Sequence, residues 1–229
     1  MGLGRSILAG VTEVLADREI AIIFEDDLVC VPGTYDYLSA ALQRYRGDPR
    51  VMSVTGWTHP RVTPAGIADQ PYFDGKAESW VWGTTAEAWR GMREDALLLM
   101  HRVAAAGEDI SRYGADLPAM AAVEAEKNIW AVRWLYWHIL NRGLCLRPPW
   151  SMVEHIGFGV GATNCAGESW LVNPPLRPCP PIPTRWPEPA EHPECSKLWR
   201  QIGSERPTIP GRLLGLARRA AGSAVAWFR

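Results

Sequence analysis

The apolar positions of the chain fall into short runs and helical repeats that predict an α/β protein. Residues 21–24 form a continuous apolar run, which is typical of a strand buried on both faces, as in a parallel sheet. Residues 34–46 place apolar side chains at helical spacing, and residues 50–55 have the character of a second strand. Upstream, one apolar face within residues 7–15 predicts a helix that leads into the first strand.

Three consecutive carboxylates, Glu25, Asp26 and Asp27, follow the first predicted strand. Ligands of open α/β sheets bind at the carboxyl ends of strands, which is where this triplet falls. Adjacent carboxylates repel one another unless a cation lies among them, and hard oxygen ligands suit Mg²⁺ or Mn²⁺. The pattern therefore indicates a metal site with a phosphate-bearing substrate. The alternative is a solvated acidic turn between a strand and the next element.

Four segments in a fixed order carry a family resemblance that covers roughly residues 1–165. They are Phe-Glu-Asp-Asp-Leu with the following helix and Arg-Val-Met-Ser-Val-Thr-Gly strand, then residues 78–84, 130–134 and 151–159. Together they resemble the core of GT-A glycosyltransferases. The likeness is to bacterial family-2-like nucleotide-diphospho-sugar transferases, which are distantly similar to the N-acetylglucosaminyltransferase I group. The acidic triplet would then be the family's "DXD" metal motif.

The resemblance implies a GT-A-like, Rossmann-like mixed sheet flanked by helices. Members of the family normally begin with βα units that bind the nucleotide base and precede the metal motif by many tens of residues. Here the acidic triplet begins at residue 25. We therefore expect residues 1–172 to form a partial GT-A-like domain that lacks this N-terminal nucleotide-binding portion.

Two further regions are expected beyond this domain. Residues 173–210 begin with closely spaced prolines, which exclude regular helix and central strand and predict an extended arm. Residues 211–229 alternate arginines with apolar residues, as in a basic amphipathic helix that contacts an anionic membrane or packs on its own domain. The net charge of −1 gives no general attraction to nucleic acid, and no long apolar run predicts a membrane span. We expect a cytoplasmic protein, peripheral at the inner membrane face if the C-terminal helix binds lipid.

The family's chemistry assigns roles to the acidic triplet. Asp27, helped by Asp26, would hold Mn²⁺ or Mg²⁺, and the cation would neutralise the charge that grows on the departing diphosphate. Relatives often carry histidine at the position of Asn164, whose amide oxygen is a third candidate ligand. The donor-binding set comprises Glu25, Asp26, Asp27 and Arg133, with Arg133 placed to pair with the diphosphate or with a nearby carboxylate such as Glu126.

An inverting transfer also needs a general base beside the acceptor hydroxyl. The family commonly has an acidic residue just before the Trp-Ala-Val-Arg-Trp-like segment, but Asn128 stands there in this chain. Glu126 is the nearest substitute, followed by Glu124. The alternative is that both glutamates simply solvate a helix face.

Tryptophan accounts for 12 of the 22 aromatic residues, and these indoles can either pack in the core or contact a ligand. Indoles at 130, 134 and 137 have the spacing of a buried helical stripe. Trp57, Trp80 and Trp82 flank the ends of predicted strands, where indole faces can stack on sugars. Trp80 and Trp82 are two residues apart, so we expect them on one strand face. These three are candidate acceptor contacts, with core packing as the alternative.

The sequence thus favours a metal-dependent, inverting glycosyltransferase that uses a nucleotide-diphosphate sugar and a glycan or glycolipid acceptor, as in polysaccharide biosynthesis. A second hypothesis is a non-catalytic relative that binds a glycan or a partner enzyme. A third is another metal-dependent nucleotide enzyme, such as a nucleotidyltransferase, although that leaves the tryptophan-rich segments unexplained.

Overall fold

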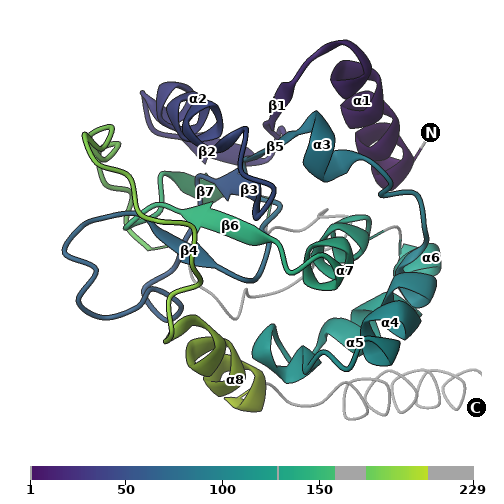
Figure 1. The fold of residues 1–229 in the computed structure, drawn as a ribbon. Coiled ribbons are helices and arrows are strands. Elements are labelled where there is room, and N and C mark those ends of the chain that lie inside the picture. The colour runs from purple at the N-terminus through teal and green to yellow at the C-terminus, as the bar shows by residue number, and fades with distance from the viewer. Residues whose placement is uncertain (1, 128, 158–173, 206–229) are drawn as a thin grey trace, which may run out of the picture.

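The chain folds as a mixed α/β protein, as a computed structural model describing residues 2–127, 129–157 and 174–205 shows (Figure 1). The strands are β1 (Ile20–Ile23), β2 (Leu28–Cys30), β3 (Val51–Thr55), β4 (Tyr72–Asp74), β5 (Trp82–Thr85), β6 (Leu144–Arg147) and β7 (Val153–His155). The helices are α1 (Leu3–Asp17), α2 (Thr34–Tyr45), α3 (Ala86–Trp89), α4 (Ala96–Ala105), α5 (Leu117–Ala122), α6 (Glu124–Lys127), α7 (Ala131–Leu140) and α8 (Cys195–Glu205), with a 3-10 turn at Ile110–Arg112. The expected α/β class, a mixed sheet flanked by helices, is confirmed.

The main sheet has the strand order β1-β5-β3-β6-β4. β5 pairs antiparallel with both β1 and β3, and β3 pairs parallel with β6. β1, β3 and β6 therefore point the same way, and their carboxyl ends lie at one edge of the sheet. Segments far apart in sequence meet there, including the turn after β1, the loop after β3 and the loop that enters β5.

The position of β1 differs from the one that its sequence predicts. Among the described residues β1 pairs only with β5, so it lies at the edge of the sheet and not between parallel neighbours. Its apolar run is nevertheless covered on both sides. Ile20 and Ile22 pack against the core under α2, whereas Ala21 and Ile23 pack against the core under α1. The apolar run of β1 therefore indicates that the strand is covered on both sides. It does not indicate whether the neighbouring strand is parallel or antiparallel.

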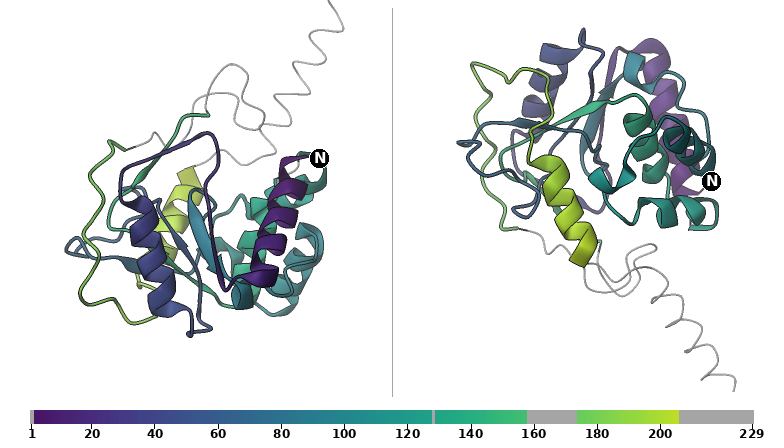
Figure 2. Two further views of the ribbon diagram at one scale, coloured as in Figure 1. Left: turned by 90° about the horizontal axis from the view of Figure 1, so that it is seen from above. Right: turned by 60° about the horizontal axis from the view of Figure 1, so that its bottom comes forward.

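Helix α2 covers one face of the sheet, as its apolar spacing predicts (Figures 1 and 2). Its residues Leu38, Leu42 and Tyr45 are all at most 3% exposed and pack on side chains of β3 and β6. The residue before the helix is Gly33 at φ 91°, a conformation that favours glycine, so the chain enters the helix through a left-handed turn. The hydroxyl of Thr34, the first residue of the helix, donates to the Val31 carbonyl oxygen at 2.7 Å.

The opposite face is covered by α1, α3 and α7, which meet around a cluster of tryptophans. The ring of Trp82 lies at its centre, with ring centroids of Trp89, Trp130 and Trp134 at 5.8, 5.4 and 5.2 Å. The indoles at 130 and 134 were expected as a buried helical stripe, and they are 4% and 0% exposed. Helices α4 and α5 pack on the outer side of α7.

Residues 174–193 contain neither helix nor a regular strand, and they run across α2 and the sheet before α8 begins (Figure 1). Carbonyl oxygens of this proline-rich segment accept hydrogen bonds from Tyr45, from Arg50 and, at 2.9 Å, from the indole of Trp150. The expected arm to residue 210 is interrupted, because α8 starts at Cys195, two residues after the last of the closely spaced prolines. The predicted helix at 211–229 lies outside the described residues.

Candidate functional site

The acidic triplet forms the turn between β1 and β2, at the edge of the sheet where β1, β3 and β6 end. The Leu28 amide donates to the Glu25 carbonyl oxygen at 3.3 Å and closes the turn. The Ile156 amide donates to the Asp27 carbonyl oxygen at 2.9 Å. A two-stranded sheet of β2 and β7 continues from this turn and places Leu28 opposite His155. The backbone thus fixes the triplet from both sides.

The imidazole of His155 is the nearest side chain to Asp27. Its Nε2 atom lies 3.3 Å from Asp27 Oδ2, and its Nδ1 atom accepts a hydrogen bond from the Gly157 amide at 3.1 Å. With Nδ1 as an acceptor, a neutral ring carries its proton on Nε2 and donates it to the carboxylate. Burial lowers the pKa of His155, although the Asp27 charge acts in the opposite direction. The contact therefore holds Asp27 through a neutral donor and leaves its negative charge in place.

The three carboxylates are not equivalent in their surroundings. Burial raises the pKa of Glu25 to about 7, and the charges of Asp27, Asp26 and Glu78 add to that shift. A carboxyl group with this pKa keeps its proton to higher pH than an ordinary glutamate, and a bound cation would favour its ionised form. Asp27 Oδ1 is buried and has no hydrogen-bond partner among the described residues. The turn therefore holds an uncompensated oxygen next to a carboxyl group that resists ionisation.

Glu78 is a fourth carboxylate of this site that sequence reasoning missed. Its Oε1 atom accepts from the Ser79 amide at 2.9 Å, and its Oε2 atom lies 3.6 Å from Nη1 of Arg147. Its charge contributes to the raised pKa of Glu25. Glu78 opens one of the four family-like segments, so its position was visible in the sequence. Its proximity to the triplet follows from strand order, because the loop into β5 ends at the edge where β1 ends.

Behind this edge lies a buried ionic network centred on Arg147, the last residue of β6. Arg147 Nε donates to Asp74 Oδ2 at 2.7 Å, and the two side chains are 0% and 1% exposed. The same Asp74 oxygen accepts from the indole Nε1 of Trp199 on α8 at 2.9 Å. Arg147 also donates to the backbone oxygen of Trp57 at 3.3 Å. The network links α8, the sheet and Glu78 into one rigid support.

The three expected acceptor tryptophans have different surroundings. Trp82 is 0% exposed at the centre of the tryptophan cluster, so in this structure it is a core residue. Trp57 is 3% exposed and belongs to a buried cluster that also contains Trp199. Trp80 is half-buried and meets the His155 ring at 4.7 Å and the Trp57 ring at 5.2 Å. Of the three, Trp80 alone joins exposure with proximity to the acidic turn.

The alternation expected for Trp80 and Trp82 is broken at Val81, which has φ 43°. A β-branched residue in this left-handed region is a local strain. The Val81 carbonyl oxygen accepts from the Gly56 amide at 2.8 Å, which stabilises the bend. The bend sends Trp80 toward His155 and Trp82 into the core.

The candidate base residues lie on α6. Glu124 is 5% exposed, and its carboxylate accepts two hydrogen bonds from the guanidinium of Arg133, at 2.8 and 3.2 Å. The expected partner of Arg133, Glu126, is exposed on the same short helix. We expected Arg133 to pair either with the donor diphosphate or with a nearby carboxylate such as Glu126. It pairs with a carboxylate, but that carboxylate belongs to Glu124. Asn128 and Asn164 lie outside the described residues.

The donor chemistry of the turn fits a hard divalent cation. Asp26 and Asp27 offer carboxylate oxygens, and the orphaned Asp27 Oδ1 has no competing donor among the described side chains. Within residues 2–127, 129–157 and 174–205, no group of three or more His, Cys, Asp or Glu side chains is arranged to hold a metal ion. A cation at this turn would accordingly take only part of its ligands from the described side chains, as Mg²⁺ often does when it keeps waters and binds substrate phosphates.

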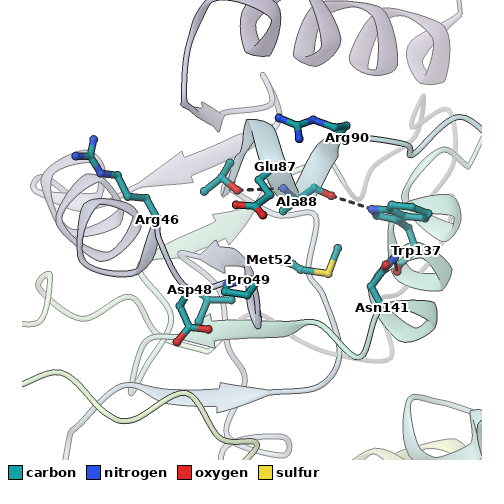
Figure 3. Close-up of a pocket in the computed structure, with 11 residues that line it drawn as sticks. Arg46, Asp48, Pro49, Met52, Glu87, Ala88, Arg90, Trp137 and Asn141 are labelled. Atoms are coloured by element: carbon teal, nitrogen blue, oxygen red, sulfur yellow. Dashed lines mark hydrogen bonds between the residues drawn. The ribbon is translucent and has the colours of Figure 1, made fainter.

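A separate cavity of about 300 Å³ lies at the opposite edge of the main sheet, beside the start of β3 (Figure 3). The indole of Trp137 borders it and donates to the Ala88 carbonyl oxygen at 2.8 Å. Two of its charged residues, Arg46 and Asp48, already form ion pairs with neighbouring side chains. None of the candidate metal, donor, acceptor or base residues lies among its described lining residues, and we do not assign the cavity to the candidate site.

Comparison with known protein families and with curated proteins finds no match to this chain. Within the part of the chain that the structure describes, no helix is both long and apolar enough to cross a membrane.

Proposed function

We propose that the chain is a metal-dependent, inverting glycosyltransferase of the GT-A type. It would transfer a sugar from a nucleotide-diphosphate donor to a glycan or glycolipid acceptor. The observation that carries the proposal is the placement of Asp27, whose Oδ2 atom is held by His155 while its buried Oδ1 atom has no partner among the described residues. This carboxylate lies at the carboxyl end of β1, where open α/β sheets bind their ligands.

In this proposal Asp27 and Asp26 hold Mn²⁺ or Mg²⁺. The cation, when bound, supplies Lewis-acid stabilisation of the negative charge on the departing nucleoside diphosphate. His155 keeps the Asp27 carboxylate in one orientation without neutralising it, because the neutral ring donates from Nε2. Glu25 ionises as the cation binds and adds a further negative charge to the site.

The acceptor side of the site falls to Trp80. It is the half-buried indole beside His155, and an indole face there suits the C–H surface of a sugar ring. Trp57 supports it through an edge-to-face contact at 5.2 Å. For the general base, Glu124 is committed to Arg133, so Glu126 remains the better of the two expected residues.

One observation favours a second candidate, a glycan-binding protein without transferase activity. Glu124 and Arg133, expected to act as base and donor contact, are bound to each other in a half-buried ion pair. A protein whose Glu124 and Arg133 do not take part in catalysis, but whose Trp80–His155 surface is intact, would still bind sugar and would not transfer it. The two candidates differ in whether the acidic turn binds a nucleotide with metal.

The test is calorimetric titration of UDP into the full chain, with and without Mn²⁺, for the native protein, Asp27→Asn and Asp17→Asn. Asp17 is an exposed aspartate at the end of α1 and serves as the matched control. We expect Mn²⁺-dependent binding that Asp27→Asn abolishes and Asp17→Asn preserves. Binding that ignores either the metal or Asp27, or a panel of nucleotides that all fail to bind the folded chain, would overturn the proposal. Release of nucleoside diphosphate from a bound donor would then separate a glycosyltransferase from a nucleotidyltransferase, which releases pyrophosphate.

A further inference from the structure

A groove runs along α1, and none of its described lining residues belongs to the acidic turn. It consists of two adjoining cavities of about 480 and 310 Å³. Both are lined by Thr12 of α1 and by Met92 and Arg93, which follow α3. The indole Nε1 of Trp89 donates to the Thr12 hydroxyl at 3.0 Å, and this hydrogen bond ties α1 to α3 where the cavities join.

The charge along the groove is strongly positive. Arg5, Arg90, Arg93 and Arg133 line it, and Glu13 is the single carboxylate among the described residues that line it. Arg133 is paired with Glu124. The other three guanidinium groups have no ion-pair or hydrogen-bond partner among the described residues, although the fold pairs many of its other exposed arginines.

The floor of the groove is apolar. Leu8 and Leu15 contribute from α1, and Trp89 and Met92 contribute from the opposite wall. All four belong to or pack against the tryptophan-containing core. Ala9 is exposed at the rim and leaves the groove open on the α1 side.

This combination selects one chemical class. A free phosphate would satisfy the arginines and leave the apolar floor in water, and an acidic peptide would bring carboxylates with little to fill a narrow apolar groove. A phosphate head group with an attached hydrocarbon chain matches both features, because guanidinium groups bind phosphate strongly and apolar surface gains free energy on burial. We propose that the groove binds the phosphate head group and adjoining chain of an anionic phospholipid, so that α1 contacts a membrane surface. The inference is independent of the proposed activity.

The first test uses a soluble lipid surrogate on the full chain. Dodecyl phosphate, kept below its micelle concentration, is titrated calorimetrically into the native protein, Arg5→Glu/Arg93→Glu and Arg44→Glu. Arg44 is exposed on α2, on the other face of the sheet, and Arg44→Glu is a charge-reversal control away from the groove. Glutamate is compatible with the first turn of α1, where negative charge is favoured, so Arg5→Glu is expected to fold. We expect the double variant to bind at least about tenfold more weakly and Arg44→Glu to match the native protein.

Three further measurements separate the lipid from simpler anions. Ala9→Trp fills the groove without changing charge, and we expect it to weaken dodecyl phosphate binding by a similar factor. Inorganic phosphate should bind far more weakly than dodecyl phosphate. Vesicles of phosphatidylcholine with phosphatidylglycerol should retain the native chain and Arg44→Glu in co-sedimentation, and retain the double variant at least about tenfold less tightly. Equal binding by all variants, inorganic phosphate binding as tight as dodecyl phosphate, or competition by an acidic peptide with equal affinity would each overturn the proposal.

Discussion

The Nε2 atom of His155 lies 3.3 Å from Asp27 Oδ2, and the backbone amide of Gly157 fixes the imidazole from its other nitrogen. Two residues separated by more than a hundred positions from the acidic turn thereby orient one carboxylate. The contact depends on space as well as on hydrogen bonds. A Cβ atom at Gly157 would lie 2.6 Å from Asp27 Oδ2 and 2.8 Å from His155 Cε1.

Replacing Gly157 with alanine should therefore disturb the acidic turn directly. Both distances are shorter than ordinary Cβ contacts, so Asp27 or His155 must move. We expect Mn²⁺-dependent UDP binding to weaken by at least about tenfold. Gly10→Ala is the control, because a Cβ there meets open space on α1 and should stabilise the helix by about 0.5–1 kcal/mol. Unchanged nucleotide affinity in Gly157→Ala would show that the Asp27–His155 contact does not position the ligand.

Glu25 should give the acidic turn a measurable pH dependence. Its pKa is raised from 4.5 to about 7 in the folded protein, chiefly by burial and then by Asp27, Asp26 and Glu78. The folded state therefore binds this proton more tightly than the unfolded state, so the native chain without metal loses stability as pH rises from about 4.5 to about 7. Glu25→Gln should remove that loss.

Urea unfolding of the native chain and Glu25→Gln checks this expectation. We compare the free energy of unfolding of Glu25→Gln with that of the native chain at each pH. The difference in favour of the variant should be larger at pH 8 than at pH 4 by about 2 kcal/mol, a value reduced for solvent screening of this partly exposed group. Added Mn²⁺ should shrink the gap at pH 8, because the cation stabilises the ionised triplet of the native chain. A difference between the two proteins that does not change with pH would contradict the assignment.

Local sequence patterns predicted the helices that cover the sheet, because an amphipathic period directly reports a buried face. Leu38, Leu42 and Tyr45 of α2 are examples, and all three are in the core. The direction of β1 was not available from its pattern. Apolar side chains at residues 20–23 require covering layers, and layers above and below an antiparallel edge strand meet that requirement as well as a parallel sheet does. Phe24, the last residue of the predicted run, lies beyond the strand and is 46% exposed.

The candidate site was predicted in part for a similar reason. The acidic triplet is contiguous, so its place after β1 followed from the local pattern. Trp80 and Trp82 were expected on one strand face, but the positive φ of Val81 separates them, and a valine gives no sequence signal for that conformation. Glu78 and His155 join the triplet only through strand order, which a single sequence does not encode in any short segment.

The buried pair Arg147–Asp74 should be the most sensitive ionic contact of the fold. Burial alone would lower the pKa of Arg147, but the neighbouring Asp74, Cys145 and Glu78 raise it, so the guanidinium stays charged. Asp74→Asn would leave the more distant Glu78 as the remaining carboxylate partner of Arg147 among the described residues, and it would weaken the anchor of Trp199. We expect a loss of about 3–5 kcal/mol in the free energy of unfolding.

The control for Asp74→Asn is an ion pair of nearly the same length at the surface. Arg46 and Glu19 lie 2.8 Å apart, but their side chains are 62% and 78% exposed. Glu19→Gln should cost less than about 1 kcal/mol, because water already solvates both groups. Similar costs for the two variants in chemical denaturation would show that burial does not decide the strength of the Arg147 network.

His138 should make the protein sensitive to acid. It is 0% exposed on α7, and its ring lies 4.7 Å from that of Trp134. Burial lowers the pKa of His138 from 6.5 to about 3, so the folded protein keeps the ring neutral. Above pH 6.5 both states are neutral and the group has no effect. As the pH falls below that value the unfolded chain binds a proton that the fold rejects, and stability is lost progressively down to about pH 3.

His138→Leu should abolish the pH-dependent loss of stability that the imidazole causes. Any packing defect of the leucine lowers the free energy of unfolding equally at every pH. Between pH 7 and pH 4.5 the native chain should lose roughly 2–3 kcal/mol more of its unfolding free energy than the variant does. His101→Leu, at an exposed position on α4, should keep the native pH dependence. Urea denaturation at both pH values measures the difference, and parallel curves for the native chain and His138→Leu would mean that the buried imidazole accepts a proton without unfolding. Because only the change with pH is compared, a leucine that packs poorly in the core cannot imitate the predicted result.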